Sequence, residues 1–426
     1  MANGAGAFLA LFTAVFALMT GVGLLSTLLS LRTVVEGFTT QTTGLIMASY
    51  FLGMSMGHIV GPRLVERVGH IRAYACLAAV VAAAALSHGL LLNPFTWALL
   101  RFFSGVAMFG LYMVVESWLN ECTPPELRGR VFSIYMVMTY CGMAAGQLML
   151  NLGDVSSGQL YMVTGILFVS SLVPVSATRS VSPELPAPSK LKLPVLIARA
   201  PVGMVGCFTA GLINSAFYAM GPVFCSRVGL SVPQTSWFMT TTILGGLVLQ
   251  WPMGAISDRF DRPFVLSVLA VLLAIVSLCN QAIDTQFFGL LLAGMAVLGG
   301  LSFAVYPVSV ARAHDLFDPG EIVSVSSALI FCYGLGACIG PVVASSAMEV
   351  TGRPQGVFFF ITAIAGGFGL LVFVLRAREK VAIVVADDQT AFVPMDSTSP
   401  VASVMDPRWE DEAAVPSGGG SQRVNS

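Results

Sequence analysis

Residues 254–262 read Gly-Ala-Ile-Ser-Asp-Arg-Phe-Asp-Arg, and residues 62–70 read Pro-Arg-Leu-Val-Glu-Arg-Val-Gly-His. Each stretch is a short polar turn after a long apolar run, and each places a carboxylate immediately before an arginine. The two stretches begin 192 positions apart (62 to 254), which is nearly half of the 426-residue chain. A repeat of this length predicts two halves with the same architecture.

The composition excludes an ordinary soluble domain. Of the 426 residues, 56% are hydrophobic and only 10% are charged, whereas soluble domains carry about 25% charged residues. The net charge of −1 and the lack of a basic block give no indication of a nucleic-acid partner. The eight cysteines form no CxxC pair and the four histidines have no metal-ligand spacing, so the sequence predicts no disulfide framework, metal site or cofactor.

Twelve apolar runs are long enough to cross a bilayer, which takes about 20 residues at about 1.5 Å per residue. The sequence therefore predicts an all-α membrane protein of twelve transmembrane helices in a lipid bilayer. The first six runs are 7–31, 44–60, 73–92, 97–120, 131–152 and 160–175, and the second six are 201–224, 236–255, 264–279, 286–310, 323–344 and 356–375.

The polar stretches divide the chain into four parts. Residues 1–177 form a predicted six-helix bundle, residues 178–200 a cytoplasmic linker, and residues 201–376 a second six-helix bundle. Residues 377–426 are rich in Ser, Pro and Gly and lack a long apolar run, which is typical of a disordered tail.

The loop charges predict the orientation. With the N-terminus in the cytoplasm, fifteen Lys and Arg residues near the membrane lie on the cytoplasmic side and three, Arg32, Arg227 and Arg353, lie on the other. This bias follows the positive-inside rule and places both termini in the cytoplasm. The first run has no basic residue before it and is too long for a signal-peptide core, so we expect it to be retained as a helix.

Several motifs resemble those of one transporter family. Residues 254–262 resemble the loop signature of the major facilitator superfamily, Gly-x-x-x-Asp-Arg-x-Gly-Arg-Arg, although the first-half copy has Pro62 and Glu66 where Gly and Asp are usual. Arg101 resembles the arginine of the family's fourth helix. Further stretches resemble the YcaD-like bacterial branch: 67–72, 115–120, 128–130, 146–147, 306–309 and 333–341.

This resemblance covers roughly residues 7–376. It implies two pseudo-symmetric six-helix bundles in the cytoplasmic (inner) membrane and a secondary transporter for a small molecule. The fifth helix lacks the Gly-Pro of the family's antiporter motif at Gly146-Gln147. The direction of transport therefore stays open, with export slightly favoured by the resemblance.

The two repeated loops are candidates for a cytoplasmic gate. Helices five and eleven begin on the cytoplasmic face, and their first N–H groups carry a partial positive charge. We expect Glu66 and Asp258 to cap such helix ends, and the neighbouring arginines to form ion pairs across the two halves. The alternative is that these charges only set topology. The candidate gate residues are Glu66, Arg67, Gly69, Gly254, Asp258, Arg259, Asp261 and Arg262.

Arg101 is a candidate for the cavity, because a charge inside a membrane is costly unless it is paired or hydrated. The alternative is an arginine whose head group reaches the outer interface. The nearest outer carboxylates are Glu36, in the first loop, and Asp154, after helix five. We expect one of them to be its partner.

Glu116 is a candidate for ion coupling. It lies fifteen residues after Arg101, about 22 Å away along a helix, so the two cannot pair. A buried carboxylic acid favours its protonated form, which suits a coupling proton. The alternative is a structural ion pair with Arg128 or Arg130. We expect His58 to be a core histidine with satisfied hydrogen bonds.

Uncharged polar groups within the runs either line a cavity or bond between helices. The candidates are Gln147, Asn214 and Tyr306, and Tyr218 and Gln250 are further residues of this kind. Overall, the sequence favours a monomeric, proton-coupled carrier of a small solute. It has no GxxxxGK[ST] loop for ATP, no nucleophile cluster for an enzyme and no selectivity loop for a channel. A receptor or another non-transporting protein on the same fold is the alternative.

Overall fold

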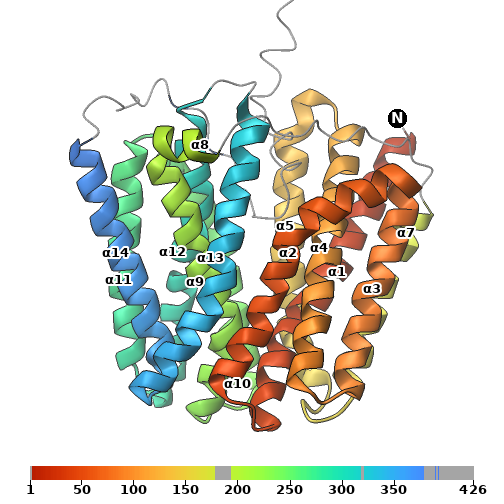
Figure 1. Ribbon diagram of the computed structural model, residues 1–426, viewed down its shortest axis with the longest axis horizontal. Helices are drawn as coiled ribbons and strands as arrows, with labels where there is room; N and C mark the ends of the chain where they lie inside the picture. The colour runs from red at the N-terminus through yellow and green to blue at the C-terminus, as the bar shows by residue number, and fades with distance from the viewer. Residues whose placement is uncertain (1, 178–192, 318–320, 379–388, 390–391, 393–426) are drawn as a thin grey trace, which may run out of the picture.

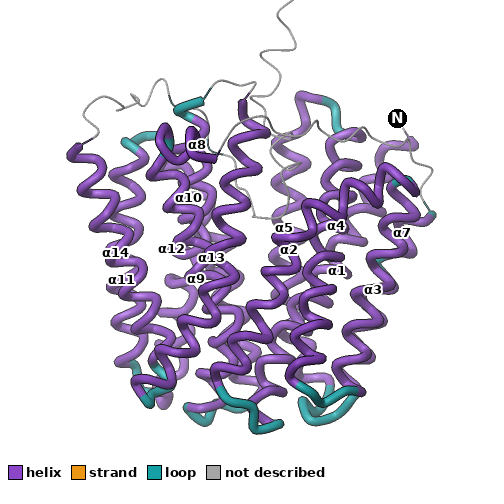
Figure 2. The backbone as a smooth tube through the Cα atoms, in the orientation of Figure 1, coloured by secondary structure: helices purple, strands orange, loops and turns teal. Residues whose placement is uncertain are grey.

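The computed structural model describes residues 2–177, 193–317, 321–378, 389 and 392. Within these residues the regular structure is entirely helical, and long helices run side by side (Figures 1 and 2). The first half contains α1 (Ala2–Val35), α2 (Thr40–Val68), α3 (His70–Leu90), α4 (Pro94–Cys122), α5 (Arg128–Met149), α6 (Gln159–Ser170) and α7 (Leu172–Ser176). The second half contains α8 (Leu193–Arg199), α9 (Pro201–Arg227), α10 (Val232–Ser257), α11 (Arg262–Ala282), α12 (Phe288–His314), α13 (Ile322–Thr351) and α14 (Gly356–Arg378).

The predicted membrane fold is confirmed. Among the described residues, eleven helical segments are long and apolar enough to cross a membrane, with α6 and α7 together forming one of them. The predicted eighth run is α10, which is 26 residues long but is not among the eleven. Its polar residues explain the difference, because Thr240, Thr242 and Gln250 are buried inside the protein and do not face lipid.

A short helix lies in the connection between the two halves. The predicted linker contains α8, a helix of seven residues that immediately precedes α9. Residues 178–192 lie outside the described part of the chain, as does most of the predicted tail. The domain boundaries at 177 and 200 therefore stay predictions.

The repeat seen in the sequence extends to helix packing. Helix α2 crosses α4 in the first half, and α10 crosses α12 in the second. Glycines allow both crossings, because a methyl group on any of them would lie 2.0 Å from a carbonyl oxygen of the partner helix. Small residues at crossings let membrane helices approach closely without a hydrophobic driving force. The glycines are Gly53 and Gly105 in the first pair and Gly245 and Gly299 in the second.

The two repeated loops lie at one end of the bundle, where α1 begins and α14 ends (Figure 1). We name it the gate-loop end, defined by residue 69 and residues 258–261. The other end, which carries the loops at 36–39, 91–93, 228–231 and 352–355, is the opposite end. Ser231 begins α10 there with a reciprocal capping box to Gln234, which satisfies two N–H groups at the start of the helix.

Candidate functional site

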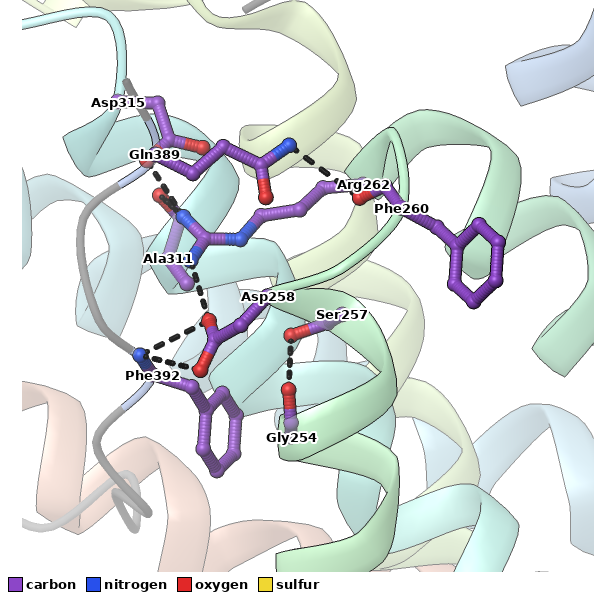
Figure 3. A network of polar contacts seen from close by, with 9 residues as sticks. All are labelled: Gly254, Ser257, Asp258, Phe260, Arg262, Ala311, Asp315, Gln389 and Phe392. Atoms are coloured by element: carbon purple, nitrogen blue, oxygen red, sulfur yellow. Dashed lines mark hydrogen bonds and ion pairs between the residues drawn. The ribbon is translucent and has the colours of Figure 1, made fainter. Parts of the chain in front are cut away.

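Arg262 organises the second-half gate loop. Its side chain is fully buried, and Nη2 donates to Asp258 Oδ1 at 2.9 Å. Its Nη1 donates to the Ala311 carbonyl at 3.0 Å and to Asp315 Oδ1 at 2.5 Å (Figure 3). The side chain of Asp315 is also fully buried. One guanidinium therefore ties the ends of α10, α11 and α12, and its charge is compensated as burial requires.

This arrangement corrects the predicted cap role of Asp258. The ion pairs that Arg262 forms with Asp258 and Asp315 lie within the second half, and ion pairs across the two halves stay a prediction. Asp258 is the C-cap residue of α10, and it does not cap helix five. The N-cap position of α5 is Leu127, which has no side-chain cap hydrogen bond.

Asp261 has a second structural role in the same loop. Its carboxylate accepts the N–H of Phe264 and so caps the first turn of α11. It also accepts from Arg376 Nε at 2.7 Å, which ties α14 to the loop. Arg259, by contrast, is exposed.

The first-half loop is built differently. Glu66 and Arg67 are exposed, and the described residues contain no ion-pair partner for either. Gly69 has φ 81°, a left-handed conformation that glycine adopts without strain, and it joins α2 to α3. His70 stands where Arg262 stands in the other loop, four residues after the carboxylate, and packs its ring against Trp118 at 5.9 Å. The repeat thus preserves a buried residue at this point but replaces an ion pair by a ring contact.

Arg101 does not pair with the carboxylates expected for it. Its side chain is buried in α4, and its guanidinium lies 4.2 Å from the ring centre of Tyr50 in α2, a cation–π contact. Glu36 instead pairs with Arg32 at 2.7 Å. Asp154 accepts the backbone N–H of Ser156 at 2.8 Å, and this hydrogen bond lowers the pKa of the Asp154 carboxyl.

Glu116 is fully buried in α4. The hydroxyl of Tyr135, in α5, donates to Glu116 Oε1 at 2.9 Å. Tyr135 could not be predicted from the sequence, because the two residues lie on different helices and nothing in their spacing pairs them. The neighbouring Ser117 turns its hydroxyl to the Met113 carbonyl in its own helix.

Gln147 joins α1, α5 and α10. Its Nε2 donates to the Gly23 carbonyl at 2.9 Å, so this side chain bonds between helices of the first half. Its backbone carbonyl accepts from Ser236 Oγ of the second half at 2.6 Å. Asn214 is buried in α9, and its Oδ1 has no hydrogen-bond partner among the described residues.

Aromatic rings of the two halves are in contact. Tyr140 of the first half stacks on Phe303 of the second, with ring centres 5.9 Å apart, and Phe303 stacks in turn on Tyr218. Tyr306 is buried with its ring edge-to-face against Tyr333 at 5.2 Å. Tyr218 and Tyr306 were among the predicted polar candidates, whereas the ring stack that joins the halves had no signal in the sequence.

His58 corrects a further expectation. It is exposed on α2 and is not a core histidine. Its Nδ1 contacts the Ser55 carbonyl of its own helix.

Polar contacts between the two halves gather at the opposite end of the bundle. The backbone N–H of Gln41 donates to Glu349 Oε1 at 3.2 Å, joining the start of α2 to the end of α13. Arg227 contacts Thr40, which brings the end of α9 to the same place. Asn151, just after α5, donates to Ser236 of α10 at 3.3 Å. These contacts join the two halves at the end away from the gate loops.

Comparison with known proteins gives a consistent result. A family model described as Major Facilitator Superfamily matches residues 11–231 and 226–403. The uncharacterized MFS-type transporter YcaD of Escherichia fergusonii is 26% identical over 374 residues, covering 87% of this chain and 95% of that protein. The nucleoside transporter NupG has a TM-score of 0.74 at 14% identity, covering 88% of this chain and 100% of that one. A D-xylose-proton symporter has a TM-score of 0.68 at 14% identity, covering 90% and 99%.

Proposed function

Because the chain belongs to the major facilitator superfamily, we propose that it moves a small solute by alternating access, driven by a proton gradient. The family and the resemblance to YcaD-like transporters confirm the prediction made from the motifs, and they make the protein a transporter and not an enzyme. Its membrane-spanning helices place it in a lipid bilayer. The solute, the coupling ion and the direction are the proposed part.

The observation that carries the proposal is the closure of one end. The start of α2 meets the end of α13, and the end of α5 meets the start of α10, through Gln41, Asn151 and Ser236. A carrier needs two discrete arrangements of its halves, each open at one end only. Contacts between halves that gather at one end support the view that this is one of the two.

The loop charges assign the ends in this proposal. The gate-loop end of the bundle carries most of the Lys and Arg residues near the membrane, so we place this end in the cytoplasm. The closed end then faces outward, and the structure represents a state shut to the outside. The protein works in the cytoplasmic (inner) membrane and as a monomer, since each chain contains both halves.

Glu116 is the proposed coupling group. It is fully buried, and its contact with the Tyr135 hydroxyl at 2.9 Å joins α4 to α5. A carboxyl group there is neutral when protonated and negatively charged when it releases the proton. This change of charge alters the energy of the buried site. Arg101 cannot serve in this way, because arginine does not deprotonate in proteins. Its contact with Tyr50 instead suits a group that organises α2 against α4.

A test of coupling compares accumulation with exchange in proteoliposomes. We expect Glu116→Gln to abolish proton-driven accumulation and to spare exchange of solute down its own gradient. Arg101→Ala should weaken both. If Glu116→Gln still accumulates solute with normal pH dependence, Glu116 is a structural tie and the proton is carried elsewhere.

The solute class follows from the scarcity of charge. Within the described spans the buried groups near the centre are mostly aromatic or uncharged, including Asn214, Tyr306 and the Tyr140–Phe303 stack. The scarcity of charged side chains favours a small neutral or amphipathic solute over a highly charged one. A thermal-shift screen of neutral metabolites, nucleosides and sugars on the purified protein is the direct way to find it, and export is the direction that we favour.

A further inference from the structure

Two residues from the C-terminal stretch lie against the second-half gate loop (Figure 3). The backbone N–H of Phe392 donates to both carboxylate oxygens of Asp258, at 3.0 and 3.2 Å. The side-chain amide of Gln389 donates to the carbonyl of Phe260 at 3.2 Å. Residues that follow α10 by more than a hundred positions in the sequence thus contact the end of this helix.

The ring of Phe392 packs against apolar residues beside these hydrogen bonds. It is partly buried and packs against the hydrophobic core. A methyl group added to Gly254 would lie only 2.1 Å from its Cδ1 and 2.3 Å from its Cε1. The missing side chain at Gly254 is therefore what lets an aromatic ring lie directly on the last turn of α10.

The backbone N–H of Phe392 adds a second hydrogen-bond donor to the Asp258 carboxylate. One oxygen already accepts from Arg262, and an ionised carboxylate has room for several further donors. Hydrogen bonds to an ionised acceptor are about twice as strong as neutral ones. An N–H beside a large apolar side chain fits both features of the site, the carboxylate and the glycine slot.

We propose that Gln389 and Phe392 form an intramolecular ligand of this site and hold the gate-loop end open. With the Phe392 N–H on both carboxylate oxygens of Asp258 and its ring on Gly254, the chain's own C-terminal stretch covers the last turn of α10, and contacts of the first half with this turn compete with it. Closure of the gate-loop end then requires Phe392 to leave. Docking at Asp258 stands by itself, whereas its effect on closure rests on the proposed function.

Docking is tested in the full-length protein in nanodiscs, with the photo-crosslinking residue benzoyl-phenylalanine at position 392. We expect crosslinks to the last turn of α10, around residues 254–258, when the products are mapped by mass spectrometry. The same probe at Trp409, another aromatic residue of the C-terminal stretch, is the control and should not give this product. Crosslinks that avoid α10, or that are equal from both positions, overturn the proposal.

A pair of variants tests whether the Asp258 carboxylate binds Phe392. Asp258→Asn removes the charge that accepts the Phe392 N–H, and we expect the yield of the α10 product to fall several-fold. Glu121→Gln removes an exposed carboxylate at the same end of the protein and should leave the yield unchanged. Equal yields in the two variants would show that the carboxylate does not bind the segment.

The effect on closure is measured without a solute. Spin labels at Arg63 and Ile197, both exposed and one in each half, report the width of the gate-loop end without occupying the Phe392 site. We expect Phe392→Ala to increase the population with a short distance, and Trp409→Ala to leave it as in the native chain. If crosslinking places Phe392 on α10 but Phe392→Ala leaves the distances unchanged, the segment docks without holding the end open and that part of the inference is wrong. A loss of transport in other experiments would leave the docking result intact.

Discussion

Gly44 offers the sharpest perturbation of the closed end. It lies in α2, where the first half meets α13 of the second. A Cβ atom at this position would lie 2.4 Å from Ser345 Oγ and 2.7 Å from the carbonyl oxygen of Pro341. The Ser345 hydroxyl can rotate away, but the Pro341 carbonyl belongs to the backbone of α13. Ordinary van der Waals contact begins near 3.4 Å, so α13 must retreat by about 0.7 Å to admit one methyl group.

Gly44→Ala should therefore destabilise the closed state selectively. Overpacking of this kind costs about 1–3 kcal/mol. Because the clash exists only while the two halves touch, the cost shifts the equilibrium toward the state that is open at the opposite end, by about 5–150-fold. A clash within one half would instead lower the stability of both states alike.

The populations are measured by electron–electron resonance between spin labels at Leu92 and Val350. Both side chains are exposed at the opposite end, one in each half. We expect Gly44→Ala to add a longer distance to the distribution. Gly366→Ala is the matched control, because a methyl group there meets nothing within 4 Å. Identical distributions for the two variants would refute the assignment of this contact as the one that closes the protein.

Two further predictions concern the gate-loop end and the topology. Asp315→Asn removes the buried partner of Arg262 and should lower the free energy of unfolding by about 1.5–3 kcal/mol, the value of a hydrogen bond to a charged group. Glu321→Gln breaks a partly exposed pair with Arg199 and should cost at most about 1 kcal/mol, so thermal unfolding in detergent separates the two. Cysteine labelling in intact cells should reach Gln355→Cys from outside and Gly69→Cys only after the membrane is opened, and the reverse pattern would overturn the orientation.

The sequence predicted the helices well because the membrane imposes one simple requirement. An apolar run of sufficient length has to be a helix when no water satisfies its backbone, and the described spans follow the predicted runs. The repeat at residues 62–70 and 254–262 correctly predicted matching halves. The exception is α10, whose threonines and Gln250 are buried among other helices and make its composition less apolar than that of a lipid-facing span.

The ion-pair partners of charged residues were predicted less well than the positions of the helices. Arg32 and Glu36, and likewise Asp258 and Arg262, are four residues apart, and this spacing favours a pair on one helix face or at a helix junction. That local signal was available in the sequence. It would have left Glu36 unavailable to Arg101 and kept the Arg262 pair within one half.

Other contacts had no signal in the sequence. The Tyr135 hydroxyl on Glu116, and the Tyr50 ring under Arg101, join different helices whose relative rotation depends on the packing of the whole bundle. Asp315 lies 53 residues after Arg262 and meets it only because α11 and α12 pack together. A single sequence specifies which groups are buried, but not which of them face one another.

Counterflow tests the central claim most directly. Proteoliposomes are loaded with an excess of the unlabelled solute found by thermal shift and diluted into a trace of the labelled solute. A carrier that exposes one site alternately to each side must return loaded, so labelled solute should rise transiently above its equilibrium level inside the vesicles. A smooth approach to equilibrium without this overshoot, at the same rate with and without unlabelled solute inside, would contradict alternating access and indicate a channel or a protein that does not transport.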